Sequence, residues 1–316
     1  MSIIKDLVMG IKAKKSTISQ EIKPKNSVKF EDEIPLTSEK DERFNTLNIE
    51  EKTFVNPISK TIALIVPDSN YPFFTQFLKS VQSYINQDGY SVMLLDTNID
   101  EELEKSYIQM LLDNNVKGMI VASRFPHLYD HLTIPLVGID DSIGPKGCLV
   151  SSDNYEGGNL VAEAFIKHKC QRIVLLRGPL GIDAFDLRAQ GVKDALKAAP
   201  HIEIYEEVIT YNINDDREIL KEIFINEQFD GIFTAYDLLA MTINELNSLY
   251  GQNRPLKIIG YDGLEMADYF YPPFSTVAQD VKKLGEKAVE LLLKQINEES
   301  IDQPMVLLPN VFHHRE

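Results

Sequence analysis

The chain has 316 residues, 44% hydrophobic and 25% charged, a composition ordinary for a globular protein with two or three packed lobes. Its formal net charge of −16 argues against a protein that coats nucleic acid indiscriminately. No apolar run approaches the roughly 20 residues that a membrane-spanning helix needs. The first twelve residues also lack the continuous apolar stretch of a signal peptide, so we expect a cytoplasmic protein without membrane contact.

The first 60 residues differ in composition from the rest of the chain. Residues 1–29 hold seven lysines against two acidic residues, a net charge of +5, so the remainder carries −21. Residues 23–57 are polar and contain three prolines, and regular apolar patterning begins only after Lys60. We therefore expect a basic head and linker over 1–59 and a main domain over 60–316. This charge asymmetry makes the head a candidate for DNA contact.

From residue 61 the chain alternates between strand-like and helix-like segments. The apolar, β-branched run 61–66 stops at Pro67 and predicts a buried strand. In 73–87, apolar residues recur at the spacing of one helix face, and Gly89 ends the segment. The further strands that we expect are 91–95, 118–122, 136–139, 172–176, 204–209, 231–235 and 257–261. The further helices that we expect are 101–113, 160–167, 187–198, 217–226, 238–249 and 281–297.

Repeated strand–helix–strand units predict parallel sheets with helices on both faces. The turn-rich stretch 151–158 separates two such runs, so the expected fold is α/β with two doubly wound lobes. In open sheets of this kind, ligands bind beyond the carboxyl ends of the strands. The side chains expected at those ends are Asp68, Asp96, Asp140, Asp141, Tyr236, Asp237 and Asp262.

This set of side chains suits a neutral polyhydroxy ligand better than a phosphate. Sugar hydroxyls donate hydrogen bonds to carboxylates, and the apolar face of a sugar packs on aromatic rings. The chain has no Gly-x-Gly-x-x-Gly sequence and no phosphate-binding loop, so we expect no nucleotide cofactor. Cys148 and Cys170 have neither metal-site spacing nor partners for a disulfide framework, and His127 and His131 lack an accompanying carboxylate signature, so we expect no metal.

Six segments in order resemble the LacI/GalR family of transcription regulators, whose sensor half is similar to periplasmic ribose-binding proteins. They span about four-fifths of the chain, from residue 60 to the C-terminus. The segments are Lys60-Thr-Ile-Ala-Leu-Ile-Val-Pro-Asp-Ser-Asn-Tyr-Pro-Phe-Phe, Ile134-Pro-Leu-Val-Gly-Ile-Asp, Ser152-Asp-Asn-Tyr-Glu-Gly-Gly, Leu187-Arg-Ala-Gln-Gly, Ile259-Gly-Tyr-Asp-Gly and Ser275-Thr-Val-Ala-Gln. The resemblance implies a type I periplasmic-binding-protein fold. It places lobe 1 at about 60–152 and 280–304, and lobe 2 at about 153–279 and 305–316.

The resemblance also implies a sugar site between the lobes. Phe73 and Phe74 would sandwich the sugar ring, Asp140 and Asp262 would accept its hydroxyl hydrogens, and Arg188 would donate a forked pair of hydrogen bonds. Gln279 would read another hydroxyl near the hinge. The four tyrosines Tyr71, Tyr211, Tyr236 and Tyr261 fall where such sites commonly show Asn, an aromatic residue, Asn and Phe.

Two departures from the ribose-type pattern concern the choice of sugar. Asp141 stands where that pattern has arginine, and Tyr236 stands where it has asparagine. Replacing a cationic donor by an anionic acceptor changes which hydroxyl pattern is accepted, because unmatched buried groups reject a ligand. We therefore include Asp141 in the expected site and do not assign ribose as the ligand.

Members of the family carry a helix-turn-helix at the N-terminus, and residues 4–22 resemble a diverged copy. Ser16, Thr17 and Gln20 would begin the recognition helix, while Lys12, Lys14 and Lys15 would meet phosphates. Gly10 interrupts the first helix, and the segment 54–60 is too short for the family's hinge helix.

The leading functional hypothesis is a sugar-controlled transcriptional repressor that binds operator DNA as a homodimer, with the helix 74–85 and the region 118–122 on the dimer face. The alternative is a cytosolic sugar sensor that no longer binds DNA and acts through a protein partner. A secreted transport receptor is disfavoured by the missing signal. An enzyme is disfavoured because Asp140 and Asp141, as neighbours on a strand, would point to opposite faces.

Overall fold

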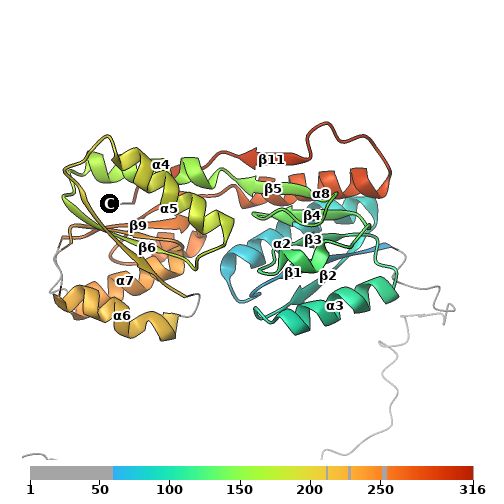
Figure 1. Cartoon of the computed structure of the whole chain (residues 1–316), viewed down its shortest axis with the longest axis horizontal. Helices are drawn as coiled ribbons and strands as arrows, with labels where there is room; N and C mark the ends of the chain where they lie inside the picture. The colour runs from blue at the N-terminus through green and yellow to red at the C-terminus, as the bar shows by residue number, and fades with distance from the viewer. Residues whose placement is uncertain (1–59, 211–212, 227–228, 251–254, 316) are drawn as a thin grey trace, which may run out of the picture. The chain divides into compact units, whose positions relative to one another are not determined.

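The structure, a computed structural model, describes residues 60–210, 213–226, 229–250 and 255–315. These residues fall within one compact unit. The expected head and linker, with all six proposed DNA-contacting residues, lie outside the described residues. The unit is built from two α/β lobes, as the sequence predicts (Figure 1).

Lobe 1 is a six-stranded sheet in the order β11-β5-β4-β3-β1-β2, in which all paired strands are parallel. Its strands are β1 (Thr61–Val66), β2 (Ser91–Asp96), β3 (Met119–Val121), β4 (Leu136–Ile139), β5 (Cys148–Ser152) and β11 (Met305–Leu308). Its helices are α2 (Pro72–Ile85), α3 (Glu101–Asp113) and α8 (Val281–Ile296), with short 3₁₀ turns η3 (Asn86–Asp88) and η4 (Pro126–Tyr129).

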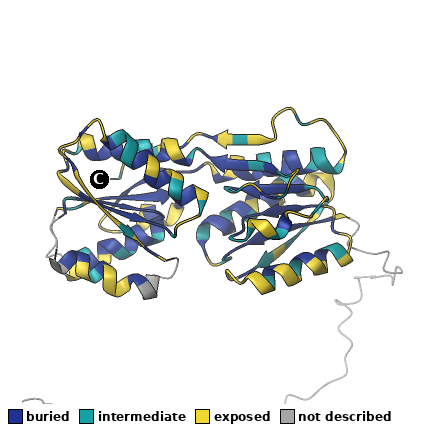
Figure 2. Ribbon diagram, viewed as in Figure 1, coloured by how far each residue is buried: buried dark blue, intermediate teal, exposed yellow. Residues whose placement is uncertain are grey.

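Alternate residues of β1 explain why lobe 1 has three layers. Ile62 and Leu64 belong to the apolar cluster formed with α2 and α8, whereas Ala63 and Ile65 belong to the cluster formed with α3. Successive side chains of a strand point to opposite faces, so a continuously apolar strand must be covered on both sides. Figure 2 shows the inner strands of each sheet as the buried centre of its lobe.

Lobe 2 is a second six-stranded sheet, in the order β12-β10-β9-β8-β6-β7, parallel except where β12 runs antiparallel to β10. Its strands are β6 (Arg172–Arg177), β7 (Glu203–Val208), β8 (Gly231–Thr234), β9 (Lys257–Asp262), β10 (Ser275–Ala278) and β12 (Val311–His313). Helices α4 (Asn154–Lys167) and α5 (Asp183–Leu196) cover one face, and α6 (Ile213–Asn226) and α7 (Asp237–Leu249) cover the other (Figure 1). The 3₁₀ turn η5 (Glu265–Tyr269) follows β9.

The chain passes between the lobes after β5, after β10 and after β11. The third passage corrects the expected lobe boundary, because 305–308 belongs to lobe 1 and not to lobe 2. The reason is backbone pairing, since Met305–Leu308 aligns in register with Leu149–Ser152 of β5. The final strand β12 then joins the lobe 2 sheet.

Most expected elements are present, but three helices begin four or more residues earlier than the sequence indicated. The largest difference is α4, which begins at Asn154 inside the expected turn, where the side chain of Asp153 accepts from the backbone N–H of Glu156 at 2.9 Å. Gly157 and Gly158 suggested a turn but lie in the helix. A Cβ at Gly158 would come within 2.2 Å of the Arg188 carbonyl oxygen, so glycine here permits close packing of α4 on α5. Helices α5 and α6 each begin four residues before the expected position.

Candidate functional site

A cleft lined by both lobes lies beyond the carboxyl ends of the strands. The space in it, including that open to solvent, is about 490 Å³. The residues expected at the site that line this cleft are Tyr71, Phe73, Phe74, Asp140, Asp141, Arg188, Tyr236, Asp262 and Gln279. Tyr261 is fully buried and packs behind the lining, and Tyr211 lies outside the described residues.

Two aspartates reach the cleft through unusual backbone conformations. Asp140 directly follows β4 and has a φ angle of 66°. Asp262 is the last residue of β9 and has a φ angle of 107°. Such left-handed conformations are uncommon for residues other than glycine, although aspartate tolerates them better than most. Backbone strain of this kind concentrates at functional sites, which supports a role for both carboxylates in binding.

Arg188 on α5 is only 4% exposed, yet its guanidinium is well accommodated. Its Nε donates to Asn154 Oδ1 at 2.8 Å, and its Nη1 donates to the carbonyl oxygen of Ala235 at 2.8 Å. The guanidinium carbon lies 3.7 Å from the centre of the Tyr261 ring. Protein contacts therefore fix the orientation of this cation in lobe 2 without any ligand.

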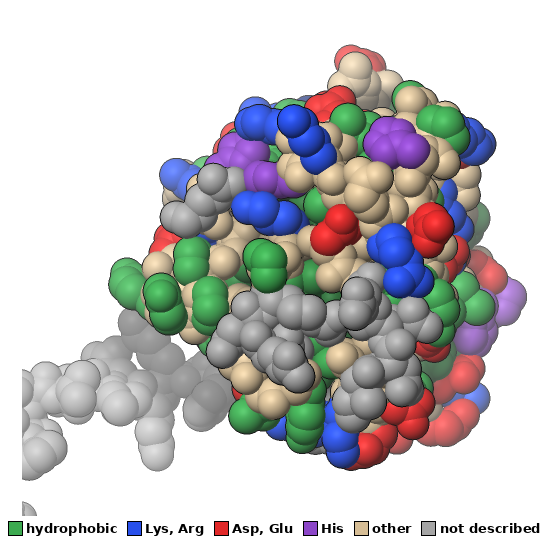
Figure 3. Space-filling model, turned by 90° about the vertical axis from the view of Figure 1, so that its left-hand side faces the viewer, with side chains coloured by type: hydrophobic (Ala, Val, Ile, Leu, Met, Phe, Trp, Pro, Cys, Tyr) green, Lys and Arg blue, Asp and Glu red, His purple; other side chains and the backbone are tan. Residues whose placement is uncertain are grey.

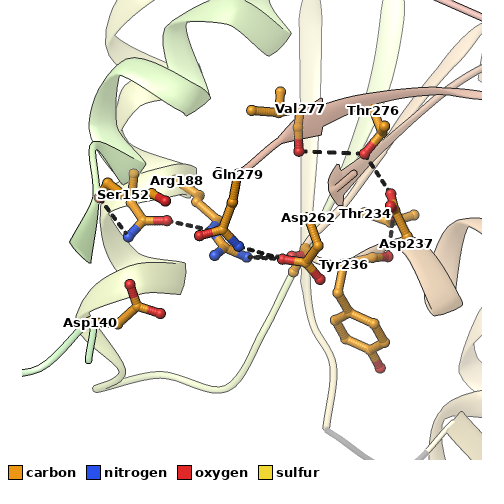
Figure 4. A network of polar contacts seen from close by, with 12 residues as sticks. Asp140, Ser152, Arg188, Thr234, Tyr236, Asp237, Asp262, Thr276, Val277 and Gln279 are labelled. Atoms are coloured by element: carbon orange, nitrogen blue, oxygen red, sulfur yellow. Dashed lines mark hydrogen bonds and ion pairs between the residues drawn. The ribbon is translucent and has the colours of Figure 1, made fainter. Parts of the chain in front are cut away.

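Asp262 is the acidic partner of Arg188. Its Oδ1 lies 3.7 Å from Arg188 Nη1 and accepts from Gln279 Nε2 at 2.7 Å, while its Oδ2 accepts from the hydroxyl of Tyr71. Burial raises the pKa of Asp262 to about 6, although Arg188 and the two hydrogen bonds oppose the shift. Figure 4 shows Arg188, Asp262 and Gln279 joined in one network, with Asp140 lying apart from it.

Asp140 and Asp141 both line the cleft, which corrects the expectation that they point to opposite faces. They lie after the end of β4, and the left-handed backbone at Asp140 turns the chain there. Asp140 accepts a hydrogen bond from Ser151 Oγ at 2.8 Å. Burial, followed by the charges of Asp183 and Asp140, raises the pKa of Asp141 to about 6.

Phe73 and Phe74 form one aromatic wall of the cleft but do not sandwich a ring between them. Their centroids are 5.3 Å apart and their planes meet at 86°, an edge-to-face contact that leaves no space for a sugar ring. Both are also packed into the core of lobe 1. Because both rings lie at the start of one helix, they line the same side of the cleft and do not face each other across a ligand.

Comparison with known proteins defines the family. The model of the periplasmic binding protein domain matches residues 62–300. The chain belongs to this family. The ribose operon repressor of Bacillus subtilis is 33% identical over 265 residues, which are 82% of this chain and 80% of that protein. The ribose operon repressor of Halalkalibacterium halodurans is 28% identical and covers 100% of this chain and 97% of its own length.

A solved structure extends the likeness to the fold of this periplasmic-binding-protein domain. The periplasmic binding protein/LacI transcriptional regulator from Alkaliphilus metalliredigens QYMF, in complex with D-xylulofuranose, superposes with a TM-score of 0.76 and 29% identity. The superposition covers 82% of this chain and 98% of that one. The expected resemblance to LacI/GalR regulators and the type I fold are thus confirmed.

The cleft includes lining residues that the sequence reasoning missed. Ser123 and Arg124 of lobe 1 and Phe185 of lobe 2 line the cleft, and the Arg124 guanidinium carbon lies 5.7 Å from the centre of the Phe185 ring. Ser123 and Arg124 lie two and three residues after the end of β3. Their position just beyond a strand end is the signal in the sequence that points to both, because ligands bind beyond the carboxyl ends of the strands in such sheets.

Within the described ranges, no group of three or more His, Cys, Asp or Glu side chains could hold a metal ion. Both cysteines are buried and carry free thiols. Over the same part of the chain, no helix has the length and apolar character needed to cross a membrane.

Proposed function

We propose that this chain is a DNA-binding transcriptional repressor controlled by a small neutral sugar held between the two lobes. The observation that carries the proposal is the cleft network of Arg188, Asp262 and Gln279 facing an aromatic wall. Fixed donors and acceptors beside aromatic rings are suited to a ligand that has many hydroxyls and an apolar ring face.

The polar groups of the cleft favour a neutral ligand over a phosphate. The lining holds three carboxylates, of Asp140, Asp141 and Asp262, against two guanidinium groups, of Arg124 and Arg188, and Arg188 is paired with Asp262. Gln279 is 8% exposed, and its Oε1 is buried without a hydrogen-bond partner among the described residues. A ligand hydroxyl that donates to this oxygen would remove the free-energy cost of leaving it unpaired.

Control of transcription is supported by the relatives and by the head sequence. Proteins named ribose operon repressors match this chain, and one match extends over its whole length. In the head, Ser16, Thr17 and Gln20 would read bases, and Lys12, Lys14 and Lys15 would neutralise phosphates. We place the protein in the cytoplasm, where such a regulator meets its operator, and assign it no enzymatic activity and no cofactor.

We further propose a homodimer, but one in which the region 118–122 is not part of the subunit interface. Strand β3, the centre of the expected region 118–122, is buried inside the lobe 1 sheet and cannot contact a second subunit. Tyr269 and Tyr271 in lobe 2 are 90% and 88% exposed, and Leu249 at the end of α7 is also exposed. Figure 3, in which the lobe 2 side of the molecule faces the viewer, shows groups of exposed hydrophobic side chains, and such surfaces are suited to subunit contact.

A gel-shift experiment tests the function directly. The full-length protein is titrated onto DNA from upstream of its own gene, with and without each sugar of a broad panel. We expect binding that falls with salt and changes with one sugar. Lys14→Ala with Lys15→Ala should weaken binding to all DNA and reduce the salt slope by roughly one unit for each phosphate that is no longer neutralised, whereas Gln20→Ala should alter sequence preference. Sugar binding without DNA binding would instead support a sensor that acts through a protein partner.

A further inference from the structure

Tyr71 connects the two lobes across the cleft. It belongs to lobe 1, where it occupies the N-cap position of α2, and its hydroxyl donates to the carboxylate of Asp262 in lobe 2. Its ring meets the ring of Tyr236, also in lobe 2, edge to face with centroids 5.9 Å apart and planes at 89°. Tyr71 is 6% exposed although it lines the cleft. The cleft is therefore bounded on this side by a large aromatic side chain.

The position of Tyr71 is held by several contacts at once. Besides Asp262 and Tyr236, it packs on Phe74 with centroids 6.1 Å apart and planes at 64°. Moving the ring aside would break the hydrogen bond to a buried carboxylate and separate two edge-to-face pairs. Hydrogen bonds to charged groups contribute about 1.5–3 kcal/mol, and aromatic pairs add about 0.5–1.5 kcal/mol each. A ligand that must displace Tyr71 therefore binds at a cost.

The hydroxyl of Tyr71 also occupies an acceptor that a sugar could use. Oδ1 of Asp262 accepts from Gln279, and Oδ2 accepts from Tyr71. A sugar lying beside Arg188 thus meets an Asp262 whose side toward Tyr71 is already hydrogen-bonded. The Tyr71 ring blocks the approach of a ligand to Oδ2 of Asp262. The Tyr71 hydroxyl takes the place of the hydroxyl that a larger sugar would donate to this oxygen.

We propose that Tyr71 determines ligand size, so that the cleft accepts a sugar of pentose size and rejects hexoses. This assignment rests on the proposed sugar-binding function and names the class of ligand for the same site. A hexose carries one more carbon bearing a hydroxyl than a pentose. When this added group is directed at the Tyr71 side of Asp262, it meets the Tyr71 ring and must displace it, which breaks the contacts that hold the ring in place. Small differences in ligand size typically change affinity by about 10–200-fold.

The test is calorimetric titration of the full-length protein with D-ribose, D-xylose and L-arabinose, and with D-glucose, D-galactose and D-fructose. For the wild type we expect at least one pentose to bind roughly tenfold or more tightly than every hexose. Tyr71→Ala removes the ring, and should reduce that ratio by about tenfold, chiefly by improving hexose affinity. Tyr71→Leu is the second variant, for use if the alanine variant does not fold. It shortens the side chain while keeping apolar packing, and it should also reduce the ratio of pentose to hexose affinity.

Tyr71→Phe is the matched control, because it keeps the ring and removes only the hydroxyl. It should retain the preference for pentoses, because the ring still limits the size of the ligand. This result would show that the preference does not depend on the hydrogen bond from the Tyr71 hydroxyl to Asp262. A wild type that binds hexoses as tightly as pentoses, or a ratio unchanged in the folded alanine or leucine variant, would overturn the assignment. A wild type that binds none of these sugars would overturn the assignment too. If the wild type binds no sugar of the broad panel, the proposed function itself is refuted. This outcome is read from the wild type alone.

Discussion

The two walls of the cleft are built on different principles. Lobe 2 contributes a buried ion pair, Arg188 and Asp262, whose members are 4% exposed each and are bonded to other protein groups. Lobe 1 contributes aromatic rings and the half-buried Asp140, whose carboxylate accepts from Ser151. A buried charge must be paired and hydrogen-bonded to be tolerated, whereas a half-buried one keeps water as a partner. Arg188 and Asp262 of lobe 2 are therefore part of the folded core, whereas the half-buried Asp140 of lobe 1 keeps its carboxylate available to the ligand.

A buried carboxyl lies in each lobe behind the cleft, and both carboxyls accept hydrogen bonds from protein groups. Glu104 in lobe 1 accepts hydrogen bonds from the hydroxyls of Ser123 and Tyr129. Asp237 in lobe 2 accepts from the Thr276 hydroxyl at 2.6 Å and from the Leu264 backbone N–H at 2.7 Å. Burial raises the pKa of both, for Asp237 to about 8, because the nearby Asp262 carboxylate adds to the effect of burial.

The largest expected effect comes from breaking the lobe 2 wall. Arg188→Ala leaves Asp262 as an uncompensated buried charge, and should lower the free energy of unfolding by about 3–5 kcal/mol. Sugar affinity should also fall, by about 1.5–3 kcal/mol or more.

Denaturant unfolding and calorimetry measure the two effects, and Arg188→Lys provides the control. Lysine keeps the positive charge but not the planar fork, so it should recover stability more than affinity. An alanine variant as stable as the wild type, with unchanged affinity, would show that the buried pair has neither role.

A change of intermediate size concerns Asp237 and pH. A carboxyl group whose pKa is higher in the folded state binds more protons there than in the unfolded chain, so its stabilising contribution is present below about pH 4 and is lost as the pH rises through its folded value. The pKa is about 6 for Asp262 and Asp141, so their stabilising contributions are lost by about pH 6. The pKa of Asp237 is about 8, so its contribution is lost only by about pH 8. Between pH 6 and 8 the decline in stability should therefore report mainly Asp237, on the order of 1–3 kcal/mol.

Thermal unfolding of Asp237→Asn across this range checks the assignment, because the amide does not titrate. The slope of melting temperature against pH between 6 and 8 should flatten in this variant. The exposed Asp302 serves as a matched control, and Asp302→Asn should keep the slope of the wild type. An Asp237→Asn slope equal to that of the wild type would contradict the account.

The smallest expected effect comes from lobe 1. Asp140→Asn keeps a residue type that tolerates the left-handed backbone at this position, but removes the charge that accepts sugar hydroxyls. Sugar affinity should fall by about 1–2 kcal/mol, while the free energy of unfolding changes by less than about 0.5 kcal/mol. A large loss of stability would show that Asp140 belongs to the core, and would remove the contrast between the walls.

Local features of the sequence predicted much of the fold and the positions of the cleft acids. The strand 61–66 was expected with its observed bounds because an apolar run ending at proline is a local signal. The start of α4 was missed because Gly157 and Gly158 indicate a turn by themselves, and only the packing of α5 explains them as helix residues. The contact of Tyr71 with Asp262 joins residues 191 positions apart on different lobes, and no sequence pattern encodes it. The Phe73–Phe74 geometry also depends on packing that residue type does not specify.

The central claim is that the cleft holds a neutral sugar, and a thermal-shift screen of the full-length protein tests it most directly. Each pentose and hexose is compared with its own phosphate ester at the same concentration and pH 7.5. A ligand that binds only the folded state raises the melting temperature by mass action. We expect a neutral sugar to raise it, and its phosphate ester to raise it less, because Asp140, Asp141 and Asp262 oppose an anion in this cleft. A rise with sugar phosphates and with none of the neutral sugars would contradict the account.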